Sequence, residues 1–186
     1  MKMFLATILV TSCAVLAQDS GYIPMSEAKP HGSAPGIKVK LIAANTNTRE
    51  YAVILAPGDE VFSGLTKFAI DNHIVSGHFT AIGGVQRATL GWWDEQKKQY
   101  KKIPINEQSE VLNMTGDIAM LNGAPVVHAH MTVSGSDGKA RGGHVLEAIV
   151  SPTFEIFVTA DAKELLKRTD PATGLALITP EAKEAK

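Results

Sequence analysis

From residue 78 onward the chain consists of short runs in which apolar and polar residues alternate, separated by turn residues. A period of two is typical of β-strands that bury one face. Asn122-Gly123 and the segment at 135–138 are signals for tight hairpins, and Gly83-Gly84 predicts a bulge or a break. The strands expected in this part span residues 78–82, 85–93, 111–120, 126–133, 144–150 and 154–159.

One segment before these strands has helical spacing instead. Val61, Leu65, Phe68 and Ala69 recur at intervals of three and four after a turn at residues 57–60. Two alternating strands, at 37–41 and 51–55, precede it, and a short helix at 162–168 and a last strand at 174–178 are expected near the end. We therefore expect an α+β fold, a largely antiparallel β-sheet with one principal helix.

The N-terminus has the three parts of a secretory signal peptide. A positive start is followed by an apolar run at residues 4–16 and by Val15-Leu16-Ala17 ahead of Gln18, and the run is too short to span a bilayer. The expected organisation is a signal peptide at 1–17, a flexible linker at 18–36, a domain at 37–180 and a tail at 181–186. Export to the periplasm or the medium follows. In the alternative reading, Val10-Thr11-Ser12-Cys13 is a lipobox and Cys13 anchors a lipoprotein to the membrane.

Charge and cysteine content exclude some classes of protein. The formal net charge is −1, and the one dense basic cluster, Lys97-Lys98 with Lys101-Lys102, flanks Tyr100 in an expected hairpin tip. A nucleic-acid binder is expected to present a clustered basic face, so no nucleic-acid partner is expected. Cys13 is the single cysteine, so a chain cut after Ala17 has no disulfide and depends on its core, a metal or oligomerisation.

Two histidines in one strand form the first part of a candidate metal site. His128 and His130 lie two residues apart in the strand expected at 126–133. Residues two apart project from the same face, roughly 7 Å apart along the strand. With Zn–N bonds of about 2.0–2.1 Å and side chains that lean together, both imidazoles can bind one ion.

His144 is expected to complete the site. Ser136-Asp137-Gly138 suits a three-residue loop, and pairing Gly135 with Lys139 places His144 opposite His130 on the same face. A loop one residue longer or shorter would turn His144 to the far face. Three imidazoles with an open position are the ligand set of catalytic zinc, although Cu²⁺ or Ni²⁺ would bind them comparably or better. His31, His73 and His78 are each interpreted as ordinary histidines of a linker, a helix end and a strand start.

Acid–base partners are less well defined. A two-residue loop at Asn122-Gly123 places Asp117 opposite His128, where it is a fourth ligand, an acceptor for an imidazole N–H, or a solvated carboxylate. Gly142-Gly143 before His144 permits a close backbone approach or a bulge, or belongs to a turn. Further candidates for catalytic groups, whose position the sequence does not fix, are Glu110, Arg141 and Glu155, whereas Glu147 faces away from His144 by parity.

An ordered set of motifs between Tyr51 and Thr159 resembles the plants-and-prokaryotes conserved domain, abbreviated PPC or PCC. The motifs are Pro57-Gly58-Asp59-Glu60, Ala81-Ile82-Gly83-Gly84-Val85, Thr115-Gly116-Asp117-Ile118, Asn122-Gly123-Ala124-Pro125 with His128-Ala129-His130, and Gly142-Gly143-His144-Val145. The resemblance implies an α+β domain that assembles as a homotrimer. In plants this domain follows an AT-hook in nuclear DNA-binding proteins, but this chain has an export signal and no Arg-Gly-Arg-Pro hook, so the DNA role is not expected. The His-x-His pair and later histidine are also similar, more distantly, to the zinc ligands of acetolactate decarboxylase, whose other catalytic residues have no match here.

Two functions remain open at this point. The first is a metal-dependent lyase or hydrolase acting on a small oxygenated molecule, which requires an open coordination position in a pocket. The second is a trimeric module that binds a metal or small ligand without turnover, in which every position on the ion is filled. The expected cofactor of both is one divalent metal ion, with zinc favoured.

Overall fold

The structure is a computed structural model that describes residues 21–28 and 31–180. The signal peptide at 1–17, Cys13 and the tail at 181–186 lie outside the described residues. The elements are β1 (Tyr22–Pro24), η1 (Met25–Glu27), β2 (Lys38–Ala44), β3 (Thr48–Leu55), α1 (Val61–Asp71), β4 (Ser76–Asp94), β5 (Gln99–Ile105), β6 (Ser109–Leu121), β7 (Ala124–Ser134), β8 (Ala140–Asp161), β9 (Lys167–Thr169) and β10 (Ala176–Ile178).

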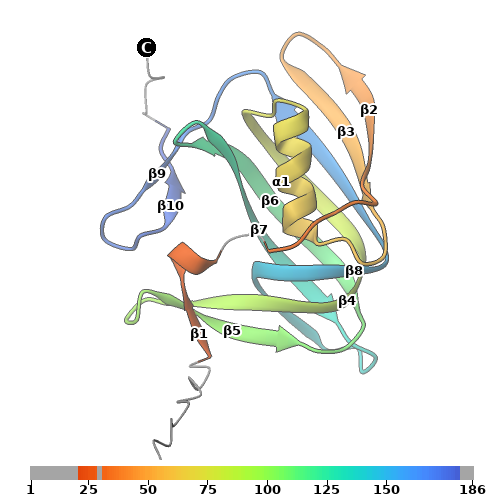
Figure 1. Ribbon diagram of the computed structural model, residues 1–186, viewed down its shortest axis with the longest axis vertical. Coiled ribbons are helices and arrows are strands. Elements are labelled where there is room, and N and C mark those ends of the chain that lie inside the picture. The colour runs from red at the N-terminus through yellow and green to blue at the C-terminus, as the bar shows by residue number, and fades with distance from the viewer. Residues whose placement is uncertain (1–20, 29–30, 181–186) are drawn as a thin grey trace, which may run out of the picture.

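A single antiparallel sheet contains most of these strands. Its order is β1-β5-β4-β6-β7-β8-β3-β2, and β9 and β10 form a separate hairpin. The long strand β4 also pairs with β8, so the sheet curls until β4, β6, β7 and β8 form a closed circuit of pairings. Helix α1 lies against the inner face of this curled sheet (Figure 1). The expected α+β fold with one principal helix is confirmed.

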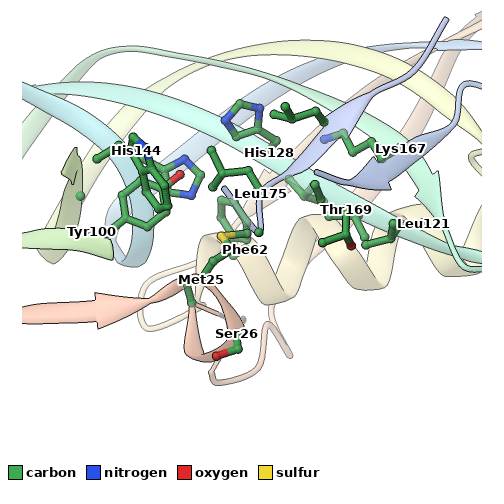
Figure 2. A pocket seen from close by; sticks show the side chains of 18 of the residues that line it. Met25, Ser26, Phe62, Tyr100, Leu121, His128, His144, Lys167, Thr169 and Leu175 are labelled. Atoms are coloured by element: carbon green, nitrogen blue, oxygen red, sulfur yellow. The ribbon is translucent and has the colours of Figure 1, made fainter. Parts of the chain in front are cut away.

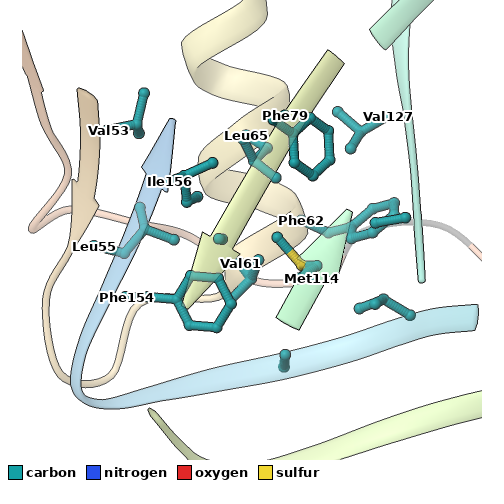
Figure 3. Packing of buried hydrophobic residues seen from close by; sticks show 14 of the residues in the cluster. Val53, Leu55, Val61, Phe62, Leu65, Phe79, Met114, Val127, Phe154 and Ile156 are labelled. Carbon is teal, nitrogen blue, oxygen red and sulfur yellow. The ribbon is translucent and has the colours of Figure 1, made fainter. Parts of the chain in front are cut away.

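The core fills the space between α1 and the sheet. Val61, Phe62 and Leu65 point from the helix toward aromatic and aliphatic side chains of the strands (Figure 3). Phe79, Phe154 and Ile156 on β4 and β8 are at most 1% exposed. Burying a large apolar side chain of this kind stabilises the fold by about 1.5–3 kcal/mol. This packing anchors β8, the strand that carries His144, and its neighbour β4.

The turn before α1 is fixed by two buried carboxylates. Glu60 is the N-cap residue, and its side chain accepts hydrogen bonds from the backbone N–H groups of Phe62 and Ser63 at 3.1 and 2.6 Å. These bonds satisfy donors that the first turn of a helix leaves unpaired. Asp59 accepts from the N–H groups of Gly36 and Ala56 at 3.0 and 2.9 Å. The turn predicted at 57–60 is therefore a capped helix start.

Three local expectations differ from the structure. Part of the expected linker at 18–36 is an ordered edge strand, because β1 pairs with β5. The prediction of a helix at 162–168 is wrong. The Met120 N–H donates to the Leu165 carbonyl at 2.8 Å, and β9 pairs with β10. These hydrogen bonds use backbone groups that a helix would otherwise pair internally. The strands expected at 144–150 and 154–159 are one continuous strand, β8. Within the described residues no helix is both long enough and apolar enough to cross a bilayer.

Candidate metal centre

The register of two hairpins brings the three predicted histidines together. Asn122 and Gly123 have φ angles of 52° and 80°, as a type I′ turn requires, and β6 and β7 pair with Asp117 opposite His128. Gly138 has φ 72° and closes the next turn, after which His130 pairs with His144. Both pairings are those that the turn chemistry predicts.

The three imidazoles converge on one region. One ligand nitrogen from each of His128, His130 and His144 lies within 4.8 Å of the others, and the ring centroids are 5.1–5.6 Å apart. Bonds of about 2.0–2.1 Å in tetrahedral geometry place the ligand atoms roughly 3.4 Å apart. Small side-chain rotations would therefore be sufficient for the three rings to share an ion.

Asp117 occupies the position of an imidazole acceptor. Its Oδ2 lies 3.2 Å from Nδ1 of His128, and its Oδ1 lies 2.5 Å from Nζ of Lys167. Burial alone would raise the pKa of Asp117. The hydrogen bonds from His128 and Lys167, together with the positive charge of Lys167, outweigh this effect and hold the pKa below its ordinary value. The carboxylate thus stays ionised, fixes the orientation of the His128 ring and leaves Nε2 of that ring for a ligand role.

His144 is the most deeply placed of the three. It is 6% exposed, and its ring stacks on Tyr100 with centroids 4.5 Å apart and an interplanar angle of 10°. Burial, reinforced by the nearby His128 and His130, lowers the pKa of His144 to about 3. The partial desolvation of the more exposed His130, together with the nearby His128, also lowers the pKa of His130. The neutral imidazole is the form that binds a metal. Among the described residues the buried Nδ1 of His144 has no hydrogen-bond partner, which fits a nitrogen reserved for a ligand.

A pH dependence of stability follows from His144. In the unfolded chain this side chain takes up a proton near pH 6.5, whereas the metal-free folded chain leaves it neutral down to a pKa of about 3. Between these values the unfolded state binds more protons, so stability falls as the pH is lowered. From pH 7 to pH 5 the metal-free protein is expected to lose about 2 kcal/mol through this residue. Urea unfolding in the presence of a chelator at both pH values measures the loss.

The control is His144→Gln, whose amide does not titrate. The variant is expected to lose about 2 kcal/mol less than the parent between the two pH values, whatever its stability at pH 7. Equal losses in variant and parent would show that His144 titrates normally in the folded chain.

Two glycines let the strands carrying the site approach closely. A Cβ atom on Gly143 would lie 2.7 Å from the backbone oxygen of Gly91, and one on Gly91 would lie 2.9 Å from Cδ1 of Tyr100. Gly91 pairs with His144 across β4 and β8. The absence of both side chains therefore allows β4 to lie close to β8, and Tyr100 on β5 to stack on the face of His144. Of the alternatives that the sequence left open for Gly142-Gly143, the close backbone approach is found at Gly143.

The cluster borders a cavity of about 960 Å³. The three histidines line it together with mainly apolar side chains from α1, β4, β7 and the two terminal segments. Figure 2 labels several of these residues, including His128 and His144. The cavity is thus in the upper part of the size range of pockets for small organic ligands, about 300–1,000 Å³.

Other candidate residues lie elsewhere. Glu110 is exposed opposite Ser134, Arg141 forms an ion pair with Glu107, and Glu155 is exposed opposite Ile82. None of the three lines the cavity that contains the histidines. Glu147 pairs with Arg87 at 3.2 Å and also lies outside that cavity. Likewise His31, His73 and His78 are exposed and do not join the cluster.

Sequence reasoning missed two residues of the site. Tyr100 was expected in a solvated hairpin tip, yet β5 carries it inward, where it is buried between Trp93 and His144. In the sequence, the apolar Tyr100 is followed by the polar Lys101, and this alternation is typical of a strand with Tyr100 on its inner face. Lys167 was expected in a helix, but its side chain is 2% exposed against Asp117. No local pattern marks that lysine.

The fold and the site together define a curled antiparallel β-domain with one helix and a three-histidine cluster beside a cavity. The sequence profile of the Plants and Prokaryotes Conserved (PCC) domain matches residues 42–161. The chain belongs to the PCC-domain family.

Three solved structures are similar over nearly their whole length. A candidate DNA-binding protein from Bacteroides thetaiotaomicron is 30% identical, with a TM-score of 0.71 and coverage of 79% of this chain and 99% of that one. A plant- and prokaryote-conserved protein from Pyrococcus horikoshii is 27% identical, with a TM-score of 0.68 and coverage of 77% and 99%. The metal-containing protein AF0104 from Archaeoglobus fulgidus is 29% identical, with a TM-score of 0.66 and coverage of 76% and 98%.

A curated relative is much longer than this chain. The bifunctional protein GlmU of Synechococcus sp. strain JA-3-3Ab is 30% identical over 129 residues, which are 68% of this chain. The chain spans about a fifth of the length of that protein, 20%. The similarity thus concerns only part of that protein.

Proposed function

We propose that this protein is a metal-dependent lyase or hydrolase for a small oxygenated molecule, with one divalent ion, preferably zinc, held by His128, His130 and His144. The observation that carries the proposal is the position of the cluster. Among the described residues, the group of ligand atoms that lie within 4.8 Å of one another contains these three histidines and no fourth side chain, and all three rings line the cavity. A centre with three protein ligands and an accessible side is the arrangement of catalytic zinc.

The residues fit this cofactor. The donor set is three imidazoles, of which His144 has an unpartnered buried nitrogen among the described residues and His128 is oriented by Asp117. A zinc ion bound there would polarise a carbonyl group or lower the pKa of a water molecule toward 7. Asp117 would keep the His128 ring in place, and Tyr100 would shield His144 from solvent. The similarity to the metal-containing AF0104 supports an ion at this centre.

DNA binding is less well supported, although two structural relatives are candidate DNA-binding proteins. The net charge of the chain is −1. In the expected basic cluster, Nζ of Lys97 lies 3.6 Å from the centroid of the Tyr22 ring, and Lys98 forms an ion pair with Glu95. Lys97 thus contacts β1 and Lys98 is paired within the hairpin, which does not favour a broad basic face.

Two further expectations stay predictions. Export, with lipidation at Cys13 as the alternative, concerns residues outside the described part of the chain. Homotrimer formation is also untested, although exposed apolar side chains on β2 and β8, such as Leu41 and Phe157, are compatible with an interface. The activity of GlmU is not carried over, because this chain covers only 20% of that protein.

The experiment is turnover before and after metal removal. The purified protein is assayed against small esters, lactones and β-keto acids as isolated, after chelation, and after reloading with Zn²⁺. We expect hydrolysis or decarboxylation that is lost on chelation and restored by zinc. Full metal occupancy without turnover of any of these compounds would instead support the binding module, in which the ion holds a ligand without converting it.

A further inference from the structure

Two segments outside the matched family range contribute to the cavity. β1 and η1 precede residue 42, and the β9–β10 hairpin follows residue 161. Met25 from η1 and Leu175 and Leu177 from the hairpin segment line the same cavity as the histidines, and Figure 2 shows Leu175 close to the imidazoles. The cavity is therefore lined partly by segments that lie outside the residues matched by the family profile.

Both segments are fixed to the sheet. β1 pairs with β5, with Tyr22 opposite Lys101. On the other side, the Met120 N–H donates to the Leu165 carbonyl at 2.8 Å, and Lys167 forms its buried ion pair with Asp117. These contacts hold the two walls in place in the ligand-free chain, which lowers the ordering entropy that a ligand would have to overcome.

The walls and the metal centre select for different parts of a ligand. Phe62, Trp92 and Leu175 are among the apolar side chains that surround the space. Lys167 also borders it, but its ammonium group is paired with Asp117. Apart from hydroxyl-bearing side chains such as Ser26, Thr66 and Thr169, the polar part of the lining is the histidine cluster. Most of the remaining surface gains free energy by covering apolar groups.

We infer that the cavity binds a small acid or carbonyl compound with an aromatic or branched aliphatic body. Its oxygen head group lies at the three-histidine centre, and its body packs against η1 and the β9–β10 hairpin. This assignment of the ligand class rests on the proposed function, because the head group is held by the ion. The strands within residues 42–161 supply the metal ligands, and the two terminal segments help to determine which apolar groups of a ligand fit.

The test compares two ligands that share a head group. The full-length protein is loaded with Co²⁺ and titrated with acetohydroxamate and with benzohydroxamate, and binding is followed by the visible spectrum of the ion. Each affinity is normalised to the affinity of the same compound for aqueous Co²⁺. We expect benzohydroxamate to bind about 10- to 100-fold more tightly after normalisation, because its ring is buried against apolar walls.

Failure of the ligand class and failure of the proposed function give different results in this experiment. Equal normalised affinities in a protein that shows a protein-bound Co²⁺ spectrum would overturn the ligand class and leave the metal centre intact. The absence of any such spectrum would overturn the proposed function, and with it the ligand class.

A matched pair of variants tests the role of the hairpin. Leu177 and Ile178 are neighbours on β10 and are 47% and 41% exposed, but only Leu177 lines the cavity. Leu177→Ser is expected to weaken benzohydroxamate binding about three- to tenfold and to leave acetohydroxamate binding unchanged, because part of the apolar wall is lost. Ile178→Ser is expected to change neither affinity. Equal effects of the two substitutions, or no effect of Leu177→Ser, would overturn the assignment of the hairpin as a ligand wall.

Discussion

Replacing His130 with alanine is expected to abolish stoichiometric metal binding. The variant loses one of three nitrogen ligands that lie within 4.8 Å of one another, and two imidazoles do not hold a divalent ion against a competing chelator. Elemental analysis after dialysis against a weak chelator is expected to give roughly one ion per chain in the parent and below about 0.1 in the variant. His130 is exposed, so its removal leaves the core packing unchanged, and circular dichroism is expected to be the same for both proteins.

The matched control is His31→Ala, which removes an exposed histidine that does not belong to the cluster. This variant is expected to bind metal at the same occupancy as the parent protein. Full metal occupancy in the His130→Ala variant would show that the ion is held elsewhere in the chain.

Replacing Asp117 with alanine is expected to reduce both stability and metal affinity. Lys167, whose side chain is 2% exposed, would lose the carboxylate that lies 2.5 Å from its Nζ. Leaving one member of a buried ion pair without its partner costs about 3–5 kcal/mol. We expect about 3 kcal/mol, because the Asp117 side chain is itself 24% exposed. Loss of the acceptor for His128 is expected to weaken metal binding about 10- to 100-fold as well.

A double variant separates these two effects. In Asp117→Ala with Lys167→Met, the unpaired ammonium is gone, so most of the lost stability is expected to return. Metal affinity is expected to stay low, because His128 still has no carboxylate acceptor. Urea unfolding measures the first quantity and competition with a zinc-sensitive dye measures the second. Recovery of both together would show that Asp117 acts only through folding and does not orient His128.

The histidine cluster was predictable because it depends on short-range rules. The turn at Asn122-Gly123 fixes the register that sets Asp117 beside His128, and the turn ending at Gly138 fixes the register that sets His144 beside His130. Each pairing follows from loop length and from the alternation of side chains along a strand. The capped start of α1 was predictable for the same reason, since its signals lie within a few residues of one another.

The remainder of the site depends on contacts between distant segments. Tyr100 reaches His144 because β4 pairs with β8 as well as with β5, a closure of the sheet that no local pattern specifies. Lys167 reaches Asp117 because the chain after β8 continues along β6 in place of a helix. The segment that contains β1 is rich in small residues and turn formers, and its order comes from the available edge of β5. In each case a contact between distant segments, and not the local sequence, determines the conformation of the segment.

The most direct measurement is anomalous diffraction from crystals of the purified protein at the zinc absorption edge. The expected result is one anomalous peak per chain, within about 2.0–2.1 Å of one nitrogen each from His128, His130 and His144. A well-ordered structure with no peak at these rings, in protein purified without chelators and supplied with zinc, would contradict the three-histidine centre.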